Sequence, residues 1–236
     1  NRRSRGLGDV YKRQSQEIAD KIYTSYDDLF HNILPNVIEK LDSNTAYWPS
    51  SPGSSFGKKE SFTSGDVHYW GVWWGKEPFT NYENKIPRFM SEFGFQSFPD
   101  FTSVLKYTNE SDHNIYSDVM KSHQRSSIGN ETIEEYMLRE YNKPNSFKNF
   151  LYVSQLLQAE GISMGMEAHR RNRDICMGSL YWQLNDCWPV ASWSSIDYYG
   201  KWKALHYKTR ESFATNLISL QKLSLIHISE PTRPSV

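Results

Sequence analysis

The chain has 236 residues and balances 27 Lys and Arg against 27 Asp and Glu, so its formal net charge at pH 7 is zero. This balance argues against nucleic acid or an anionic membrane as a partner, because proteins that bind either one carry an excess of basic residues. No apolar run reaches the length of a membrane span. The two cysteines, Cys176 and Cys187, have neither the number nor the spacing of a disulfide framework or a zinc site.

The two ends differ from the rest of the chain. Residues 1–14 contain five Arg and Lys without helical or strand periodicity, and residues 222–236 are equally irregular. Both read like translated adapter sequence, so we expect them to be non-native scars that flank a partial domain at 15–221. The alternative is a basic arm and a short amphipathic tail.

Helical periodicity dominates several segments. Apolar residues recur at helical spacing over 17–33, Pro35 interrupts the pattern, and a second short helix is expected to end at Leu41. A strong helix is predicted after Pro144, with weaker patterns over 132–141 and 201–213.

Four short segments are predicted to be strands, and long loops and helices separate them. They lie at 47–48, 66–70, 88–92 and 176–182, and the stretch from 71 to 79 is expected to be a loop. Such an order is typical of a parallel α/β sheet built from strand–helix units. Four units make half of an eight-stranded (β/α)8 TIM barrel, which would leave two strand edges open. We therefore expect this piece to be unstable alone.

Aromatic and polar residues stand at the predicted carboxyl ends of these strands. In parallel strands these ends converge, and Glu92 would then lie among aromatic rings and amides. A carboxylate in such a wall suits the binding and cleavage of a sugar. The alternative is an ordinary strand whose glutamate faces solvent.

Four sequence blocks strengthen the first interpretation. They read Tyr-Trp-Pro-Ser-Ser-Pro from Tyr47, Asp-Val-His-Tyr-Trp-Gly from Asp66, Arg-Phe-Met-Ser-Glu-Phe-Gly from Arg88, and Leu-Tyr-Trp-Gln-Leu-Asn-Asp-Cys-Trp-Pro from Leu180. In this order they resemble the second half, strands five to eight, of the catalytic barrel of the β-mannosidases in glycoside hydrolase family 2. The resemblance covers about residues 15 to 216.

The resemblance implies roles for individual residues. Glu92 corresponds to the nucleophile of a retaining, two-carboxylate hydrolysis, and Tyr69 to an aromatic residue whose hydroxyl reaches that nucleophile. His68 and Trp70 would contact the sugar or support that contact, and Trp182 corresponds to a platform beneath it. Further substrate-binding candidates are Asn185 and Asp186, although an Asn-Asp pair before Trp-Pro can equally shape a turn. Four other tryptophans are expected to pack or to form a rim: Trp73, Trp74, Trp188 and Trp193.

The general acid/base is the departure from the family pattern. The family carries it in an Asn-Glu pair upstream of strand five, and no such pair precedes Tyr47. Asn109-Glu110 and Asn130-Glu131 follow strand seven and do not fit that position. We therefore expect the parent protein to be a β-mannosidase and this piece to be inactive.

Other readings stay open. The parent could be a β-galactosidase or β-glucuronidase of the same family, the aromatic residues could belong to a non-catalytic carbohydrate-binding domain, or the domain could be degenerate. A two-carboxylate hydrolysis needs no cofactor or metal, and the histidines are too scattered to hold one. The expected partners are β-mannoside oligosaccharides or glycoconjugates, together with the rest of the parent chain: the other barrel half and β-sandwich domains. The sequence does not decide localisation.

Overall fold

The computed structural model describes residues 16–53 and 59–220 of the protein. Both predicted scars, at 1–14 and 222–236, lie outside the described residues. None of the helices in the described part is long and apolar enough to span a membrane.

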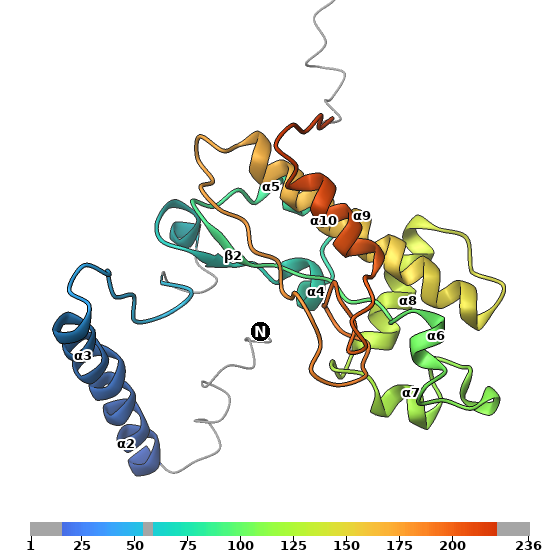
Figure 1. The fold of residues 1–236 in the computed structure, drawn as a ribbon, viewed down its shortest axis with the longest axis horizontal. Coiled ribbons are helices and arrows are strands. Elements are labelled where there is room, and N and C mark those ends of the chain that lie inside the picture. Colours follow the sequence, from blue (N-terminus) through green and yellow to red (C-terminus); the bar gives the residue numbers. More distant parts are fainter. Residues whose placement is uncertain (1–15, 54–58, 221–236) are drawn as a thin grey trace, which may run out of the picture.

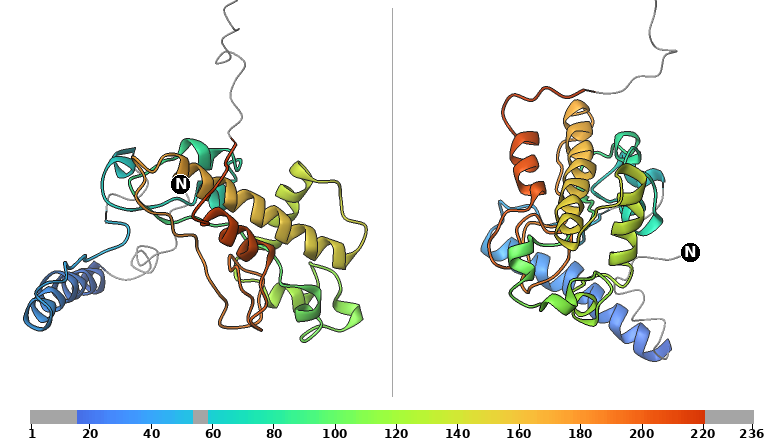
Figure 2. Two further views of the ribbon diagram at one scale, coloured as in Figure 1. Left: turned by 45° about the horizontal axis from the view of Figure 1, so that its top comes forward. Right: turned by 90° about the vertical axis from the view of Figure 1, so that its right-hand side faces the viewer.

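The N-terminal segment is helical, as its apolar periodicity predicts, but it forms one continuous rod without the expected interruption at Pro35. It consists of α2 (Gln16–Asp27), the π-helical η1 (Asp28–Ile33) and α3 (Leu34–Leu41). Pro35 does not break the rod, because it lies in the first turn of α3, where the missing N–H costs little. The rod stands apart from the rest of the described chain in Figures 1 and 2. Its apolar side chains are consequently exposed, as at Leu41.

A small parallel sheet forms the centre of the fold. β1 (Val67–His68) pairs in parallel with β2 (Met90–Glu92), and the backbone N–H of Tyr69 donates to the Glu92 carbonyl over 2.8 Å. The segment 176–182 runs along the other edge of β2. It forms a parallel bridge at Ser179 and a 2.8 Å hydrogen bond from the Leu180 N–H to the Met90 carbonyl. The order across the centre is therefore β1, β2 and then segment 176–182.

Helices connect these extended segments. The first is the 3-10 turn η2 (Lys59–Thr63), and between β1 and β2 lie α4 (Gly71–Gly75) and α5 (Asn81–Asn84). After β2 come α6 (Phe101–Val104), η3 (Glu110–Asp112), α7 (Asp118–Ser122), α8 (Gly129–Glu140), α9 (Phe147–Arg171) and finally α10 (Ala204–Ser212).

The long helix α9 covers the sheet and carries α10 beside it (Figure 1). Gln155 accepts a hydrogen bond from the first residue of α10, and Arg170 donates to the carbonyl of Ser212 at its end, so the two helices run in the same direction. Two glycines let α9 approach closely, because a Cβ at Gly161 would lie 2.1 Å from the ring of Phe79 and one at Gly165 would lie 2.8 Å from that of Phe93. The core that α9 closes is rich in aromatic residues, including Trp73, Tyr82, Phe93, Phe95, Phe98 and Tyr136.

The structure corrects two predicted elements. Residues 47–48 form no strand, because the Tyr47 hydroxyl bonds to the carbonyl of Phe30 on the N-terminal rod and no neighbouring strand pairs with them. The predicted loop at 71–79 contains α4, which is held by the complete burial of Trp73. The parallel arrangement of the other three segments is confirmed. The described residues do not show the predicted half barrel of four strands.

Candidate active site

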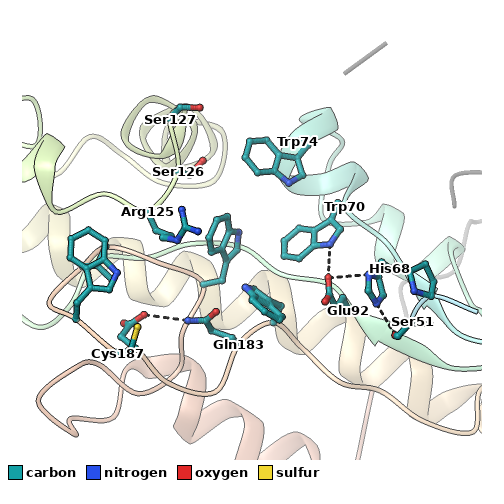
Figure 3. A pocket seen from close by; sticks show the side chains of 16 residues that line it. Ser51, His68, Trp70, Trp74, Glu92, Arg125, Ser126, Ser127, Gln183 and Cys187 are labelled. Carbon is teal, nitrogen blue, oxygen red and sulfur yellow. Dashed lines mark hydrogen bonds and ion pairs between the residues drawn. The ribbon is translucent and has the colours of Figure 1, made fainter. Parts of the chain in front are cut away.

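A pocket of about 610 Å³ opens at the carboxyl ends of β1, β2 and segment 176–182. It is lined by Ser51, Pro52, His68, Trp70, Trp74, Glu92, Arg125, Ser126, Ser127, Trp182, Gln183, Asp186, Cys187, Trp188, Val190 and Trp193 (Figure 3). Because parallel strands bring their ends together, residues that lie far apart in the sequence meet in one pocket.

Glu92, at the end of β2, has two side-chain nitrogen atoms close to one carboxylate oxygen. Its Oε2 accepts a 3.0 Å hydrogen bond from the Trp70 indole and lies 3.2 Å from Nδ1 of His68 (Figure 3). Only 23% of the Glu92 side chain is exposed. Within the described residues, no hydrogen bond to the second oxygen, Oε1, is found. This carboxylate is thus oriented at one oxygen and open at the other.

A second layer of contacts lies behind His68. Its Nε2 lies 3.0 Å from the Ser51 hydroxyl, which in turn lies 2.5 Å from the carboxylate of Asp66. Asp66 also accepts hydrogen bonds from the Ser91 hydroxyl and the Gly53 amide. Burial acts to raise the pKa of Asp66, but these hydrogen bonds outweigh burial and lower that pKa. Asp66 is therefore a carboxylate at neutral pH.

Tyr69 does not lie in the pocket, contrary to the sequence-based expectation. Successive side chains of a strand point to opposite faces, so Tyr69 points away from the side that His68 uses. Its hydroxyl donates to Glu77, and its ring centre lies 5.8 Å from that of Tyr82 in the core. Burial, followed by the Glu77 carboxylate, raises the pKa of Tyr69.

The site residues predicted at and just after the end of segment 176–182 lie in three different environments. Trp182 lines the pocket with an exposed ring, as expected of a platform. Asn185 is exposed and lies outside the pocket lining. Asp186 lines the pocket but is buried, and its two oxygens accept 2.5 Å hydrogen bonds from the hydroxyls of Ser192 and Ser194. The geometry of Asp186 is that of a structural anchor for its loop.

Several lining residues escaped the sequence analysis. Arg125 and the two serines after it come from the polar region between β2 and α8, which carries no motif. Trp74, Trp188 and Trp193 line the pocket, whereas Trp73 is fully buried. Indole rings spaced irregularly in a sequence give no sign of which will face a cavity. The prediction that these four tryptophans pack or form a rim did not separate the buried Trp73 from the three that line the pocket.

The site carries no donor set for a metal. Among the residues that the structure describes, no group of three or more His, Cys, Asp or Glu is placed to hold a metal ion. The functional groups that line the site are the Glu92 carboxylate, the His68 imidazole, the Arg125 guanidinium and several indole rings.

Comparison with known proteins places this site in a family context. No protein-family model matches the chain. β-Mannosidase B of Aspergillus flavus is 33% identical over 221 residues, which is 85% of this chain and 26% of that protein. β-Mannosidase B of Thermothelomyces thermophilus is 30% identical over 210 residues, 84% of this chain and 25% of that protein.

A solved structure gives the same result. The crystal structure of β-D-mannosidase from Dictyoglomus thermophilum matches with a TM-score of 0.74 at 37% identity, covering 79% of this chain and 23% of that one. This match supports an α/β fold of the glycosidase type. The chain is thus similar in sequence and fold to proteins named β-mannosidase, and it spans about a quarter of the length of the relatives it matches.

Proposed function

We propose that the chain is one segment of a retaining β-mannosidase and that Glu92 is its nucleophile. The observation that carries this proposal is the state of the Glu92 carboxylate: the Trp70 indole N–H and an ion-pair contact with His68 hold Oε2, and Oε1 accepts no hydrogen bond from the described residues. A nucleophile needs this combination of fixed orientation and one accessible oxygen. The relatives named β-mannosidase supply the substrate class.

In the proposed reaction, Oε1 of Glu92 attacks the anomeric carbon while the bond to the leaving oxygen breaks. The resulting glycosyl ester is then hydrolysed by water, which restores the carboxylate. Trp182 offers an exposed indole face on which the apolar side of a sugar can stack. His68 and Trp70 act on the nucleophile and line the space beside it. For Asn185 the structure offers no contact with this space.

A second carboxylate must protonate the leaving group, and in retaining enzymes it stands about 5 Å from the nucleophile. Asp186 is the other carboxylate in the described lining, and its oxygens are occupied by two serine hydroxyls. Neither Glu110 nor Glu131 lines the pocket. We place the acid/base in a part of the parent protein outside these 236 residues, and we expect this segment alone to be inactive.

The test is covalent trapping in a full-length protein that contains this segment. A 2-deoxy-2-fluoro-β-mannoside with an activated leaving group should label Glu92, as read by peptide mass spectrometry. Glu92→Gln should abolish labelling and lower kcat on aryl β-mannosides by several orders of magnitude. Label on another carboxylate would contradict the assignment.

The same protein separates the alternatives. Faster turnover of aryl β-galactosides or β-glucuronides than of β-mannosides would identify the protein as a β-galactosidase or a β-glucuronidase. A carbohydrate-binding domain would show no turnover, and its sugar affinity would be unchanged in Glu92→Gln.

A further inference from the structure

Four side chains form one line of polar contacts, two hydrogen bonds and a final ion pair, that ends on the proposed nucleophile. The line runs from Asp66 to Ser51 over 2.5 Å, to His68 over 3.0 Å, and to Glu92 over 3.2 Å. We propose that Asp66 and Ser51 are positioning residues, which hold His68 as an imidazolium so that its positive charge pairs with Oε2 of Glu92. This inference rests on the proposed function of Glu92.

The direction of each hydrogen bond follows from counting protons. Asp66 is ionised and can only accept, so the single Ser51 hydrogen is donated to it. The Ser51 oxygen must then accept from Nε2 of His68. When Glu92 is a carboxylate, as a nucleophile must be, it has no proton to give, so the 3.2 Å ion pair with His68 needs a proton on Nδ1. An imidazole ring with a proton on both nitrogens is the protonated, positively charged form.

The surroundings favour this arrangement. Only 14% of the His68 side chain is exposed, so its positive charge lies in a partly desolvated site between two carboxylates. The other titratable groups of the pocket lining are Arg125, Asp186 and Cys187. Figure 3 shows Arg125 and Cys187 at the opposite end of the pocket from His68.

The charge has a consequence for each half of the reaction. Before attack, the Trp70 hydrogen bond and the His68 ion pair at Oε2 leave Oε1 as the oxygen that bonds to the anomeric carbon. When water cleaves the ester, the departing Glu92 carboxylate regains its negative charge beside the imidazolium, which stabilises it as a leaving group. Ser51 and Asp66 touch neither the reacting carbon nor the attacking oxygen, and they act through His68.

Ser91 provides a matched control. Its hydroxyl donates to the same Asp66 oxygen as Ser51 does, over 2.6 Å, but it has no link to His68. If Ser51 merely fixed Asp66 and the loop around it, removing either hydroxyl would have a similar effect. If Ser51 transmits the charge of Asp66 to His68, only Ser51→Ala will affect the nucleophile.

The experiment measures kcat/KM against pH on an aryl β-mannoside, using the full-length protein. We expect Ser51→Ala to lower kcat/KM roughly tenfold to a hundredfold, the usual effect of losing one charge-assisted hydrogen bond. The acidic limb of its profile should move to higher pH, because Glu92 loses a neighbouring positive charge. Asp66→Asn should shift the same limb, Ser51→Thr should restore the wild-type profile, and Ser91→Ala should leave the limb in place.

Two results separate this inference from the proposed function. If Glu92→Gln keeps wild-type activity, the nucleophile assignment and this inference both fail. If Glu92→Gln is inactive but Ser51→Ala and Ser91→Ala share one rate and one pH profile, only the inference is overturned. Thermal denaturation of each variant shows whether it is folded. If Ser51→Ala is unfolded, the test uses Ser51→Thr, which keeps a hydroxyl and should retain the wild-type pH profile.

Discussion

At the scale of single residues, Tyr69 shows how strand alternation decides a role. Its hydroxyl donates to Glu77 and its ring is buried in the core, so Tyr69→Phe should leave kcat/KM within about threefold of wild type while reducing stability by about 1 kcal/mol. Steady-state kinetics and thermal denaturation of the full-length protein measure both effects. A loss of several orders of magnitude in kcat/KM would instead place the hydroxyl against Glu92.

His169 makes stability depend on pH. It is 2% exposed, its Nδ1 lies 2.8 Å from the Ser179 hydroxyl, and burial lowers its pKa to about 4. An unfolded histidine titrates near 6.5, so between about pH 6.5 and 4 the unfolded chain binds a proton that the folded chain does not, and stability falls as the pH falls. His169→Gln keeps a polar group near Ser179 but cannot titrate.

We therefore expect His169→Gln to flatten the decline of the denaturation midpoint between pH 7 and pH 5. His31→Gln, on the exposed N-terminal rod, is the control and should follow the wild-type curve. Parallel curves for all three proteins would show that His169 does not carry the acid sensitivity.

The candidate site was predictable where a residue's position in a strand determines its exposure. Glu92 and His68 could be placed together from parallel strand ends alone, and the structure brings them within 3.2 Å. The same reasoning failed for Tyr69, because adjacent strand residues cannot both face one pocket. Ser51 and Arg125 come from irregular segments, whose paths depend on tertiary contacts that the local sequence does not encode.

At the scale of elements, the contact between α9 and the core depends on the absence of a side chain at Gly161. A Cβ there would lie 2.1 Å from the buried Phe79 ring, so Gly161→Ala should destabilise the protein by about 1–3 kcal/mol through overpacking, despite its better helix propensity. The control is Gly75→Ala at the end of α4, where the added Cβ meets its nearest neighbour at an ordinary 3.6 Å. Equal denaturation midpoints for the two variants would show that α9 can shift to accept the methyl group.

Secondary structure was predicted correctly where an apolar periodicity extends over many residues, and incorrectly where the elements are short. The 25 residues of α9 and the N-terminal rod repeat their apolar pattern over many turns. The five residues of α4 begin and end with glycine, a composition typical of a loop, and their helical form depends on the burial of Trp73. Segment 176–182, predicted to be a strand, runs beside β2 with backbone hydrogen bonds but forms only an isolated bridge at Ser179.

At the scale of the whole molecule, the described chain leaves surfaces that a stable protein would cover. Leu41 and Trp48 are 81% and 63% exposed, and the outer edges of β1 and segment 176–182 pair with no strand in the described residues. Open edges and exposed apolar side chains favour association with further polypeptide. Residues 15–216 expressed alone should therefore bind a hydrophobic dye strongly and unfold without a sharp transition.

The same segment should also fail to turn over aryl β-mannosides, for a chemical reason independent of its stability. The described pocket offers one carboxylate with an available oxygen, and a retaining hydrolysis needs a second to protonate the leaving group and then activate water. The assay compares purified residues 15–216 with a full-length protein that contains them, and full-length Glu92→Gln defines the background rate. Activity above that background in 15–216 would show that the second carboxylate lies within these residues. Activity in the full-length protein alone is the result expected if that carboxylate lies outside them.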